Sequence, residues 1–266
     1  MKNLKEYGGY ALVTGASAGI GTEFARQIAA QGVSCVLVAR RQDRLEALRD
    51  ELTRAHKVDV RCVAFDLSRE DCAERLLEAT KDIPVGILVN NAGFGDGGAF
   101  ETKRPERMAE MIKLNCIAPA LLSRAYVPAM LERKRGAIVM VSSGLGIVAC
   151  PYEAVYGATK AFDLSLGEAL SSELEGTGVD VVTICPAATA TEFLAVEGFT
   201  EEECKKAYRN ADTAEYIARI TLEGLGRKTV VLAKDSAMIN AVRRVVPRSR
   251  AVSILKSNMK RRLVRN

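Results

Sequence analysis

The fold of this chain is decided by one stretch, Tyr10-Ala11-Leu12-Val13-Thr14-Gly15-Ala16-Ser17-Ala18-Gly19-Ile20-Gly21. Its first five residues are typical of a short buried strand, and apolar side chains recur at helical spacing from residue 19 to residue 31. Glycines between a strand and a helix permit a tight turn, and the unpaired N–H groups at the start of the helix attract a phosphate. The sequence therefore predicts a phosphate-binding loop, although its spacing, G-x-x-x-G-x-G, differs from the commonest G-x-G-x-x-G pattern.

The same arrangement, a short strand followed by a longer amphipathic stretch, recurs along the chain. Strand-like runs are expected at 10–14, 33–39, 60–65, 87–90, 137–141, 179–185 and 229–232, and helix-like stretches at 19–31, 42–55, 69–80, 104–133, 154–175 and 212–225. The strands are apolar almost throughout, which favours a parallel sheet covered by helices on both faces. We predict a single doubly wound α/β domain of Rossmann type, with a seven-stranded parallel sheet, over residues 1–235.

The composition is that of an ordinary globular protein, because 48% of the 266 residues are hydrophobic and 27% are charged, which excludes global disorder. The single histidine, His56, excludes a zinc site built on histidines, and seven scattered cysteines without a C-x-x-C pair disfavour one built on thiolates. We expect no metal. The N-terminus has no apolar stretch that resembles a signal peptide, so a cytoplasmic location is expected.

Residues 236–266 carry nine Lys and Arg and no acid, although the net charge of the whole chain is only +5. Apolar residues recur there at helical spacing, which predicts a basic amphipathic C-terminal extension. Such a segment either docks on the domain with its charges in water or contacts an anionic membrane surface peripherally. Nucleic acid binding is not expected, because no aromatic side chain is interleaved with the basic residues for base stacking.

The segment from about 187 to 210 breaks the alternation of strands and helices. It follows a buried strand and contains Phe193, Leu194, Phe199 and the acidic run Glu201–Glu203. In doubly wound folds, ligands bind beyond the carboxyl ends of the strands. This segment is therefore either a substrate lid or an ordinary surface excursion.

A second pattern overlaps the glycine loop, because residues 15–19 also spell G-x-S-x-G, the signature of a hydrolase nucleophile. A hydrolase of that kind needs a histidine base late in the chain, and His56 lies far too early. We therefore reject the hydrolase interpretation.

The charge after the second strand favours one dinucleotide over another. An NAD-binding fold usually has Asp or Glu about 20 residues past the glycine loop, where it binds the ribose 2′-hydroxyl. Arg40 stands at this position, 19 residues after Gly21, and Arg41 follows it. A guanidinium matches a 2′-phosphate in charge and geometry, so NADP(H) is favoured over NAD(H). The alternative, a solvated arginine at the start of the next helix, would describe Arg41 or Arg44 equally well.

A candidate acid–base pair lies on the helix predicted at 154–175. Tyr156 and Lys160 are four residues apart, hence on one face of the helix, and Ser143 lies at the end of a strand, where its hydroxyl can reach the same place. The pKa of a free tyrosine is about 10, and a nearby ammonium favours the phenolate and lowers that pKa. The pair is therefore suited to general acid–base catalysis.

Together these motifs closely resemble the short-chain dehydrogenase/reductase superfamily, over about residues 8–235. The resemblance rests on Thr14–Gly21, Asn90–Gly93, Asn115, Ser143, Tyr156, Lys160 and Pro186…Thr191, in order and at the family spacing. It implies that Tyr156 is the general acid for carbonyl reduction and the base for alcohol oxidation. Lys160 would lower the pKa of Tyr156 and bind the nicotinamide ribose. Ser143 would orient the substrate oxygen, and Asn115 would hold a water of the proton relay.

The resemblance also implies which residues contact NADP(H). They are Gly15, Ser17, Ala18, Gly19, Ile20 and Gly21 in the loop, Arg40 and Arg41 after the second strand, Asp66 and Leu67 beside the adenine, Asn91, Ala92 and Gly93 at the adenine ribose, Tyr156 and Lys160, and Pro186, Thr189 and Thr191. One residue departs from the family pattern, because Ala187 stands where the family usually has glycine. Its Cβ would resist a positive φ and alter the placement of the cofactor or the access of the substrate.

The segments expected to line the substrate pocket, 94–100, 145–152 and 193–199, are mostly apolar, which favours a hydrophobic carbonyl or secondary alcohol. The N-terminus and the basic tail resemble a subgroup with hydroxysteroid dehydrogenases and carbonyl reductases, which implies a hydroxysteroid or bile-acid type substrate. A 3-oxoacyl thioester ketoreductase is the nearest alternative, and a non-catalytic NADP-binding sensor or membrane-surface scaffold is a third. The family also implies a homodimer or homotetramer, assembled through the helices around 104–133 and 153–175.

Overall fold

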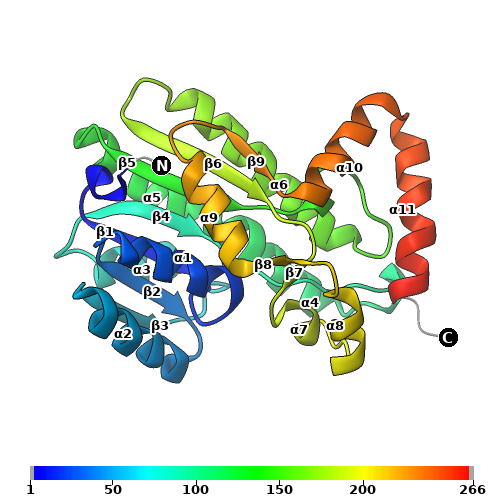
Figure 1. The fold of residues 1–266 in the computed structure, drawn as a ribbon, viewed down its shortest axis with the longest axis horizontal. Coiled ribbons are helices and arrows are strands. Elements are labelled where there is room, and N and C mark those ends of the chain that lie inside the picture. The colour runs from blue at the N-terminus through cyan, green and yellow to red at the C-terminus, as the bar shows by residue number, and fades with distance from the viewer. Residues whose placement is uncertain (1–2, 264–266) are drawn as a thin grey trace.

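The computed structural model describes residues 3–263, and its main sheet has seven strands, each parallel to its neighbours (Figure 1). The strand order is β3-β2-β1-β4-β5-β6-β9, which is the order of a doubly wound fold with one strand added after β6. The predicted fold class is therefore confirmed. The strands are β1 (Tyr10–Thr14), β2 (Cys35–Ala39), β3 (Val60–Ala64), β4 (Val85–Asn90), β5 (Gly136–Val141), β6 (Val179–Cys185) and β9 (Val230–Leu232).

Helices cover both faces of the sheet, because the strands are apolar on both sides and each helix has one apolar stripe to bury. The first face carries α1 (Gly19–Ala30), α2 (Gln42–His56) and α9 (Ala214–Gly224). The second carries α3 (Cys72–Ala79), α5 (Ala118–Glu132) and α6 (Ala154–Glu173). Phe24 and Ile217 are buried in the core of the first face, and Leu76 and Leu122 in that of the second.

The stretch predicted as one helix at 104–133 is a continuous helix, Pro105–Glu132, that changes its winding in the middle. The α-helices α4 (Pro105–Ile112) and α5 flank a π-helical turn, η3 (Lys113–Ile117). Such turns are frequent at functional sites, and this one carries Asn115. Among residues 3–263, this is the one helix whose length and composition alone would allow it to cross a membrane; here it packs on the sheet and buries Met130.

The segment that follows β6 gathers at the end of the molecule where the strands finish (Figure 1). It consists of β7 (Thr189–Ala190), α7 (Phe193–Val196) and α8 (Glu201–Ala207), and β7 pairs with β8 (Asp212–Thr213). The excursion predicted at 187–210 therefore contains a short strand and two short helices, and it lies where a doubly wound fold binds its ligands.

The C-terminal segment forms two helices, α10 (Lys234–Val245) and α11 (Arg248–Leu263), separated at Pro247 (orange to red in Figure 1). The first begins before the predicted boundary at 236 and packs on β9 and on the turn after β5, where Ser236 is fully buried. Several apolar side chains of the segment stay in solvent, since Val245 is 81% exposed and Met238 62%. Arg265, counted above in the basic extension, lies outside the described residues.

Candidate active site

The candidate acid–base residues converge where β5 ends and α6 begins. Tyr156 lies in the first turn of α6 and is only 8% exposed. Ser143 shares a side-chain hydrogen bond with Tyr156, and its Oγ accepts a second one from the Leu145 N–H at 3.2 Å. The neighbouring Ser142 instead donates to the carbonyl oxygen of Lys160 at 2.6 Å. Of the two adjacent serines, the structure thus places Ser143 beside the phenol.

The ammonium of Lys160 is buried against the end of β5 and faces an acid on the next turn of α6. Nζ donates to the carbonyl oxygen of Val141 at 2.8 Å and to Oδ2 of Asp163 at 2.9 Å. The side chains of Lys160 and Asp163 are only 6% and 4% exposed. The candidate catalytic lysine therefore has a carboxylate partner to which the sequence motif does not point.

The pKa of Tyr156 is raised above its ordinary value. Burial is the largest cause, followed by the negative charge of Glu197, whereas the hydrogen bond with Ser143 acts in the opposite direction. The negative charge of Asp163, which pairs with Lys160, raises the pKa of Tyr156 further, as the last of these causes.

Asn115 lies in η3, and its side chain holds the loop that follows β4. Oδ1 accepts from the N–H of Phe94 at 3.2 Å, and Nδ2 donates to the Phe94 carbonyl oxygen and to Thr159 Oγ1, both at 3.0 Å. A Cβ at Gly93 would lie 3.0 Å from Asn115 Oδ1 and 3.5 Å from Lys160 Nζ. Asn115 and Lys160 therefore both pack against Gly93.

The loop between β1 and α1 fits the pyrophosphate of a dinucleotide through its backbone. Gly15 and Gly19 have φ values of +66° and +59°, which favour glycine. A Cβ at Gly21 would clash with the carbonyl oxygen of Gly15, so α1 can approach the loop this closely only with glycine there. Ala18, the N-cap residue of α1, has no side-chain group that accepts a hydrogen bond, which leaves the first N–H groups available for an anion. Ser17 lies in the same loop.

Two neighbouring segments hold this loop in place. Asn91 Nδ2 donates to the Thr14 carbonyl oxygen at 2.9 Å, and the N–H of Ala92 donates to Thr14 Oγ1 at 3.1 Å. Thr191 Cγ2 lies 2.9 Å from where a Cβ of Gly19 would be, so the segment after β6 packs against the loop. These predicted cofactor contacts therefore border the glycine loop, as does Ile20 in the first turn of α1.

Other predicted cofactor contacts make local interactions. Asp66 Oδ1 accepts from both the N–H and the hydroxyl of Ser68, and Leu67 is buried in the core of the second face. The hydroxyl of Thr189 donates to the carbonyl oxygen of Ala187 at 3.1 Å. Each of these groups helps to shape the turn at the end of its strand.

The alanine that departs from the family pattern is accommodated without backbone strain. Positive φ values among the non-glycine residues of the described chain occur at Lys57, Lys134 and Tyr152, and Ala187 is not one of them. The preceding Pro186 accepts a hydrogen bond from the Gly144 N–H at 2.7 Å through its carbonyl oxygen. The expected strain at Ala187 is therefore absent.

Arg41, rather than Arg40, faces the glycine loop. Its guanidinium donates to Ser17 Oγ from Nε at 3.3 Å and from Nη2 at 3.1 Å. The side chain of Arg40 is 63% exposed and lies 3.9 Å from Glu110. Of the two arginines predicted to hold a 2′-phosphate, only Arg41 is next to the loop.

Glu192, from the segment after β6, bridges Arg41 and a third arginine. Its Oε2 accepts from Arg41 at 2.9 Å, and its Oε1 accepts from Arg44 at 2.5 Å. Hydrogen bonds from Arg44 and Arg41 lower the pKa of the Glu192 carboxyl. Two guanidinium groups that fit a phosphate therefore hold a carboxylate in this structure.

Apolar side chains surround the phenol. Phe94 and Met111 form a buried cluster with Tyr156, and Leu145 packs at its edge. Phe193, in α7, has its ring centroid 5.4 Å from that of Tyr156. The segment after β6 thus contacts the acid–base residues directly.

One charged side chain shares this apolar region. Glu197 follows α7, and its Oε1 lies where a Cβ of Gly95 would be, beside the ring of Phe193. It is also the carboxylate that acts most strongly on Tyr156. Glu197 therefore lies between the segment after β6 and the loop after β4, at the edge of the candidate site.

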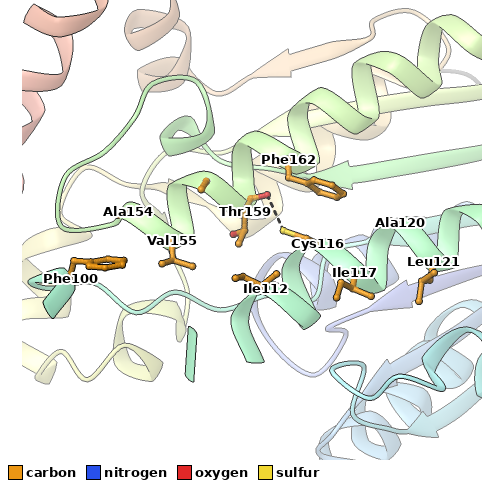
Figure 2. A pocket seen from close by; sticks show the side chains of 11 residues that line it. Phe100, Ile112, Cys116, Ile117, Ala120, Leu121, Ala154, Val155, Thr159 and Phe162 are labelled. Carbon is orange, nitrogen blue, oxygen red and sulfur yellow. Dashed lines mark hydrogen bonds between the residues drawn. The ribbon is translucent and has the colours of Figure 1, made fainter. Parts of the chain in front are cut away.

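An apolar cavity of about 790 Å³ lies elsewhere, on the outer face of the helices α4 to α6 (Figure 2). Phe100, Ile117, Leu121 and Phe162 line this outer groove and are each between 39% and 60% exposed. Phe100, which the sequence places in the substrate pocket, lines this groove instead. Tyr156 does not line it, so the groove is not the site of the acid–base chemistry.

Three acids contact the site, Asp163, Glu192 and Glu197. The sequence places Glu192 and Glu197 in or beside the segments expected to line the substrate pocket, but it does not point to Asp163. Asp163 could have been found from its spacing, because an acid three residues after Lys160 lies on the same side of a helix. No local signal links Glu192 to Arg41, since 151 residues separate them along the chain.

Comparison with known proteins agrees with this geometry. A family model described as short chain dehydrogenase matches residues 9–203. The 7β-hydroxysteroid dehydrogenase of Collinsella aerofaciens is 33% identical over 239 residues, which cover 88% of this chain and 91% of that protein. The very-long-chain 3-oxoacyl-CoA reductase of Neurospora crassa is 37% identical over 188 residues, which cover 67% of this chain and 56% of that protein.

Solved structures of similar proteins extend the match to nearly the whole chain. A structure of a 7β-hydroxysteroid dehydrogenase superposes with a TM-score of 0.87 at 28% identity, covering 96% of this chain and 99% of the other. A short-chain dehydrogenase from Sphingobium yanoikuyae in complex with NADPH gives a TM-score of 0.79 at 31% identity, covering 94% and 95%. The chain belongs to the short-chain dehydrogenase/reductase superfamily.

Proposed function

We propose that this oxidoreductase transfers hydride between NADP(H) and a bulky apolar ketone or secondary alcohol, with a hydroxysteroid or bile-acid type molecule as its substrate. The observation that carries the proposal is the apolar cluster of Phe94, Met111 and Phe193 around the buried phenol of Tyr156. Such a surface stabilises a rigid hydrocarbon skeleton next to the proton donor.

The chain is an NADP-dependent oxidoreductase, as its sequence predicts. The family match covers residues 9–203, and the similar Sphingobium yanoikuyae structure holds NADPH. In this chain, the glycine loop fits the pyrophosphate, and Arg41 beside Ser17 fits the 2′-phosphate that distinguishes NADPH from NADH.

When bound, NADPH supplies the hydride, and the residues of the chain supply the proton. Burial raises the pKa of Tyr156, so the phenol is protonated at neutral pH and can donate to a carbonyl oxygen. The hydroxyl of Ser143, already hydrogen-bonded to Tyr156, would orient the same oxygen. Oxidation of the alcohol needs the ionised phenol, so we expect oxidation to require a higher pH than reduction.

The C-terminal helices support a substrate of the hydroxysteroid class. The similar 7β-hydroxysteroid dehydrogenase structure covers 96% of this chain, so the likeness extends beyond the sheet into these helices. In this chain α10 packs behind Ser143, because Ser236 Oγ lies 2.6 Å from where a Cβ of Gly144 would be. The helix therefore helps to shape the turn that carries Ser143.

A 3-oxoacyl thioester is the second candidate substrate. It is favoured by the 37% identity to the Neurospora crassa reductase, although that similarity covers only 67% of this chain.

The experiment follows the absorbance of NADPH with steroid ketones, aromatic ketones and 3-oxoacyl thioesters. We expect turnover of steroid ketones, its loss in Tyr156→Phe with NADPH binding retained, and no change in Tyr10→Phe. Tyr10 is a matched control because its hydroxyl only donates to Asp59 on the surface. Turnover of thioesters alone would replace the proposed substrate with the second candidate, and full activity of Tyr156→Phe would refute the proposed proton donor.

We also propose that a second copy of the chain covers the outer groove, in a homodimer or homotetramer. Large apolar patches of this kind are rarely left in water by monomeric proteins. Leu121→Glu, inside the groove, should reduce the particle mass measured by light scattering. Leu131→Glu, also partly exposed on α5 but outside the groove, should leave it unchanged.

We further propose a cytoplasmic enzyme whose C-terminal helices contact an anionic membrane surface peripherally. Exposed Arg248, Arg250 and Lys256 on α11 lie near the exposed side chain of Ile254, a composition suited to an anionic surface. Truncation after residue 246 should abolish sedimentation with vesicles of anionic lipid and retain NADPH binding. Loss of folding on truncation would instead show that α11 is a structural part of the domain.

A further inference from the structure

We propose that Asp163 is a positioning residue of the acid–base site, which fixes the ammonium of Lys160 and offsets its charge so that the phenol of Tyr156 remains a proton donor. The inference deepens the proposed function and rests on the roles proposed there for Tyr156 and Lys160.

The geometry fixes the ammonium on two sides. Nζ of Lys160 donates to Asp163 Oδ2 at 2.9 Å and to the Val141 carbonyl oxygen at 2.8 Å, which uses two of its three N–H donors. Gly93 lies beside the ammonium, because a Cβ at Gly93 would be 3.5 Å from Nζ. The lysine is therefore held between the end of β5 and α6.

Stability does not account for the carboxylate. Asp163 is 3% exposed, and within the described part of the chain its Oδ1 has no hydrogen-bond partner. A buried polar atom without a partner costs stability, and replacing a buried ion pair with apolar side chains is often neutral or stabilising. The acid is therefore better explained by its effect on Lys160 than by a contribution to folding.

Few other charged groups act on this ion pair. Two thiols face it, Cys116 on η3 and Cys185 at the end of β6. Burial raises the pKa of the Cys116 thiol to about 11 and that of Cys185 to about 12, so both are neutral at neutral pH.

Two further carboxylates, Glu197 and Glu153, act on Tyr156 itself, together with the charge of Asp163. Glu168 acts on Cys185 at the far side of the pair. Asp163 is thus the carboxylate in contact with the ammonium, and its removal changes the charge that the phenol meets.

The size of the effect follows from the helix geometry. Seven residues separate Asp163 from Tyr156, which is about 10 Å along the helix axis. At an effective dielectric constant of about 20, removing one negative charge at this distance lowers the pKa of Tyr156 by about one unit.

The test compares pH profiles of kcat for alcohol oxidation in the wild type, Asp163→Asn, Asp163→Ser and Asp163→Glu. We expect the pH at which kcat rises to be about one unit lower in the Asn and Ser variants than in the wild type. In the Glu variant, this pH should return toward the wild-type value. Asp180→Asn is the matched control. Asp180 lies at the start of β6, is partly buried, and accepts a hydrogen bond from the hydroxyl of Tyr7, remote from the site. Its profile should not move.

NADPH affinity, measured by fluorescence titration, and the melting temperature show whether each variant is folded and competent to bind. A folded, NADPH-binding Asn or Ser variant with an unchanged profile would overturn the role of Asp163. Should Asp163→Asn fail to fold, Asp163→Ser decides, since its side chain is smaller and also uncharged. Retained activity in Tyr156→Phe would instead refute the proposed function itself, so the two failures are distinguishable.

Discussion

Replacing Arg41 with alanine should weaken NADPH binding and leave NADH binding almost unchanged. The guanidinium of Arg41 lies 3.1–3.3 Å from Ser17 Oγ at the glycine loop, and its planar fork matches a 2′-phosphate, which NADH lacks. Arg40→Ala is the matched control, because it removes the same charge from the adjacent, 63% exposed side chain.

The magnitude follows from the exposure of the side chain. A hydrogen bond to a charged group contributes about 1.5–3 kcal/mol. Arg41 is 41% exposed, so solvent screens part of the interaction and the lower end, about 1.5–2 kcal/mol, applies. The Kd of NADPH should therefore rise about 10- to 30-fold in Arg41→Ala. For Arg40→Ala we expect a change of less than about twofold, as for other exposed charges.

Glu192→Gln should act in the opposite direction. Its carboxylate occupies the guanidinium groups of Arg41 and Arg44, at 2.9 and 2.5 Å, and a phosphate must displace it. These side chains are all more than 40% exposed, so the pairs are worth about 0.5–1 kcal/mol in total, and NADPH affinity should rise about two- to fivefold.

The assay is a fluorescence titration of each variant with NADPH and with NADH at one fixed ionic strength, because salt screens exposed charges. An equal loss of affinity for both dinucleotides in Arg41→Ala would refute the assignment of this residue to the 2′-phosphate. A larger loss of NADPH affinity in Arg40→Ala than in Arg41→Ala would refute the choice between the two arginines.

Two further changes probe the acid–base site and the loop. Burial and then the charge of Glu197 raise the pKa of Tyr156, so in Glu197→Gln the pH at which kcat for oxidation rises should fall by about one unit or more. An unmoved pH–rate profile would show that this carboxylate does not act on the phenol. Gly21→Ala places a Cβ against the Gly15 carbonyl oxygen, which should destabilise the fold by about 1–3 kcal/mol and weaken NADPH binding. Thermal unfolding measures that loss, and a melting temperature equal to the wild type would contradict the close packing.

The local pattern of apolar and polar residues along the chain was sufficient to predict the fold. Buried strands and amphipathic helices each leave a local period in the sequence, and all seven predicted strands are present, with ends displaced by at most two residues. The helix predicted at 69–80 is shorter, Cys72–Ala79, and it is preceded by a turn in which Arg69 pairs with Asp71. The π-helical turn at Lys113–Ile117 was beyond prediction, since a single extra residue does not disturb the apolar period enough to be seen.

The candidate site was predictable where its residues are close in sequence or belong to a family motif. Tyr156 and Lys160 share a helix, and Ser143 ends the strand that leads into it. The direction in which Lys160 points was not predictable, because it depends on whether the ammonium finds a partner in the interior, and Asp163 is that partner.

The sequence alone therefore determined the order of strands and helices, the glycine loop and the identity of the groups able to carry out acid–base chemistry, because these depend on spacing along the chain. Only the tertiary structure decided that Arg41 rather than Arg40 faces the loop, that Glu192 joins it across 151 residues, and that apolar Phe100 lies on the outer face. The physical reason is that the effect of a charge or an apolar side chain depends on its burial and on its partners. Both are set by how distant segments pack, not by the residues next to them in the sequence.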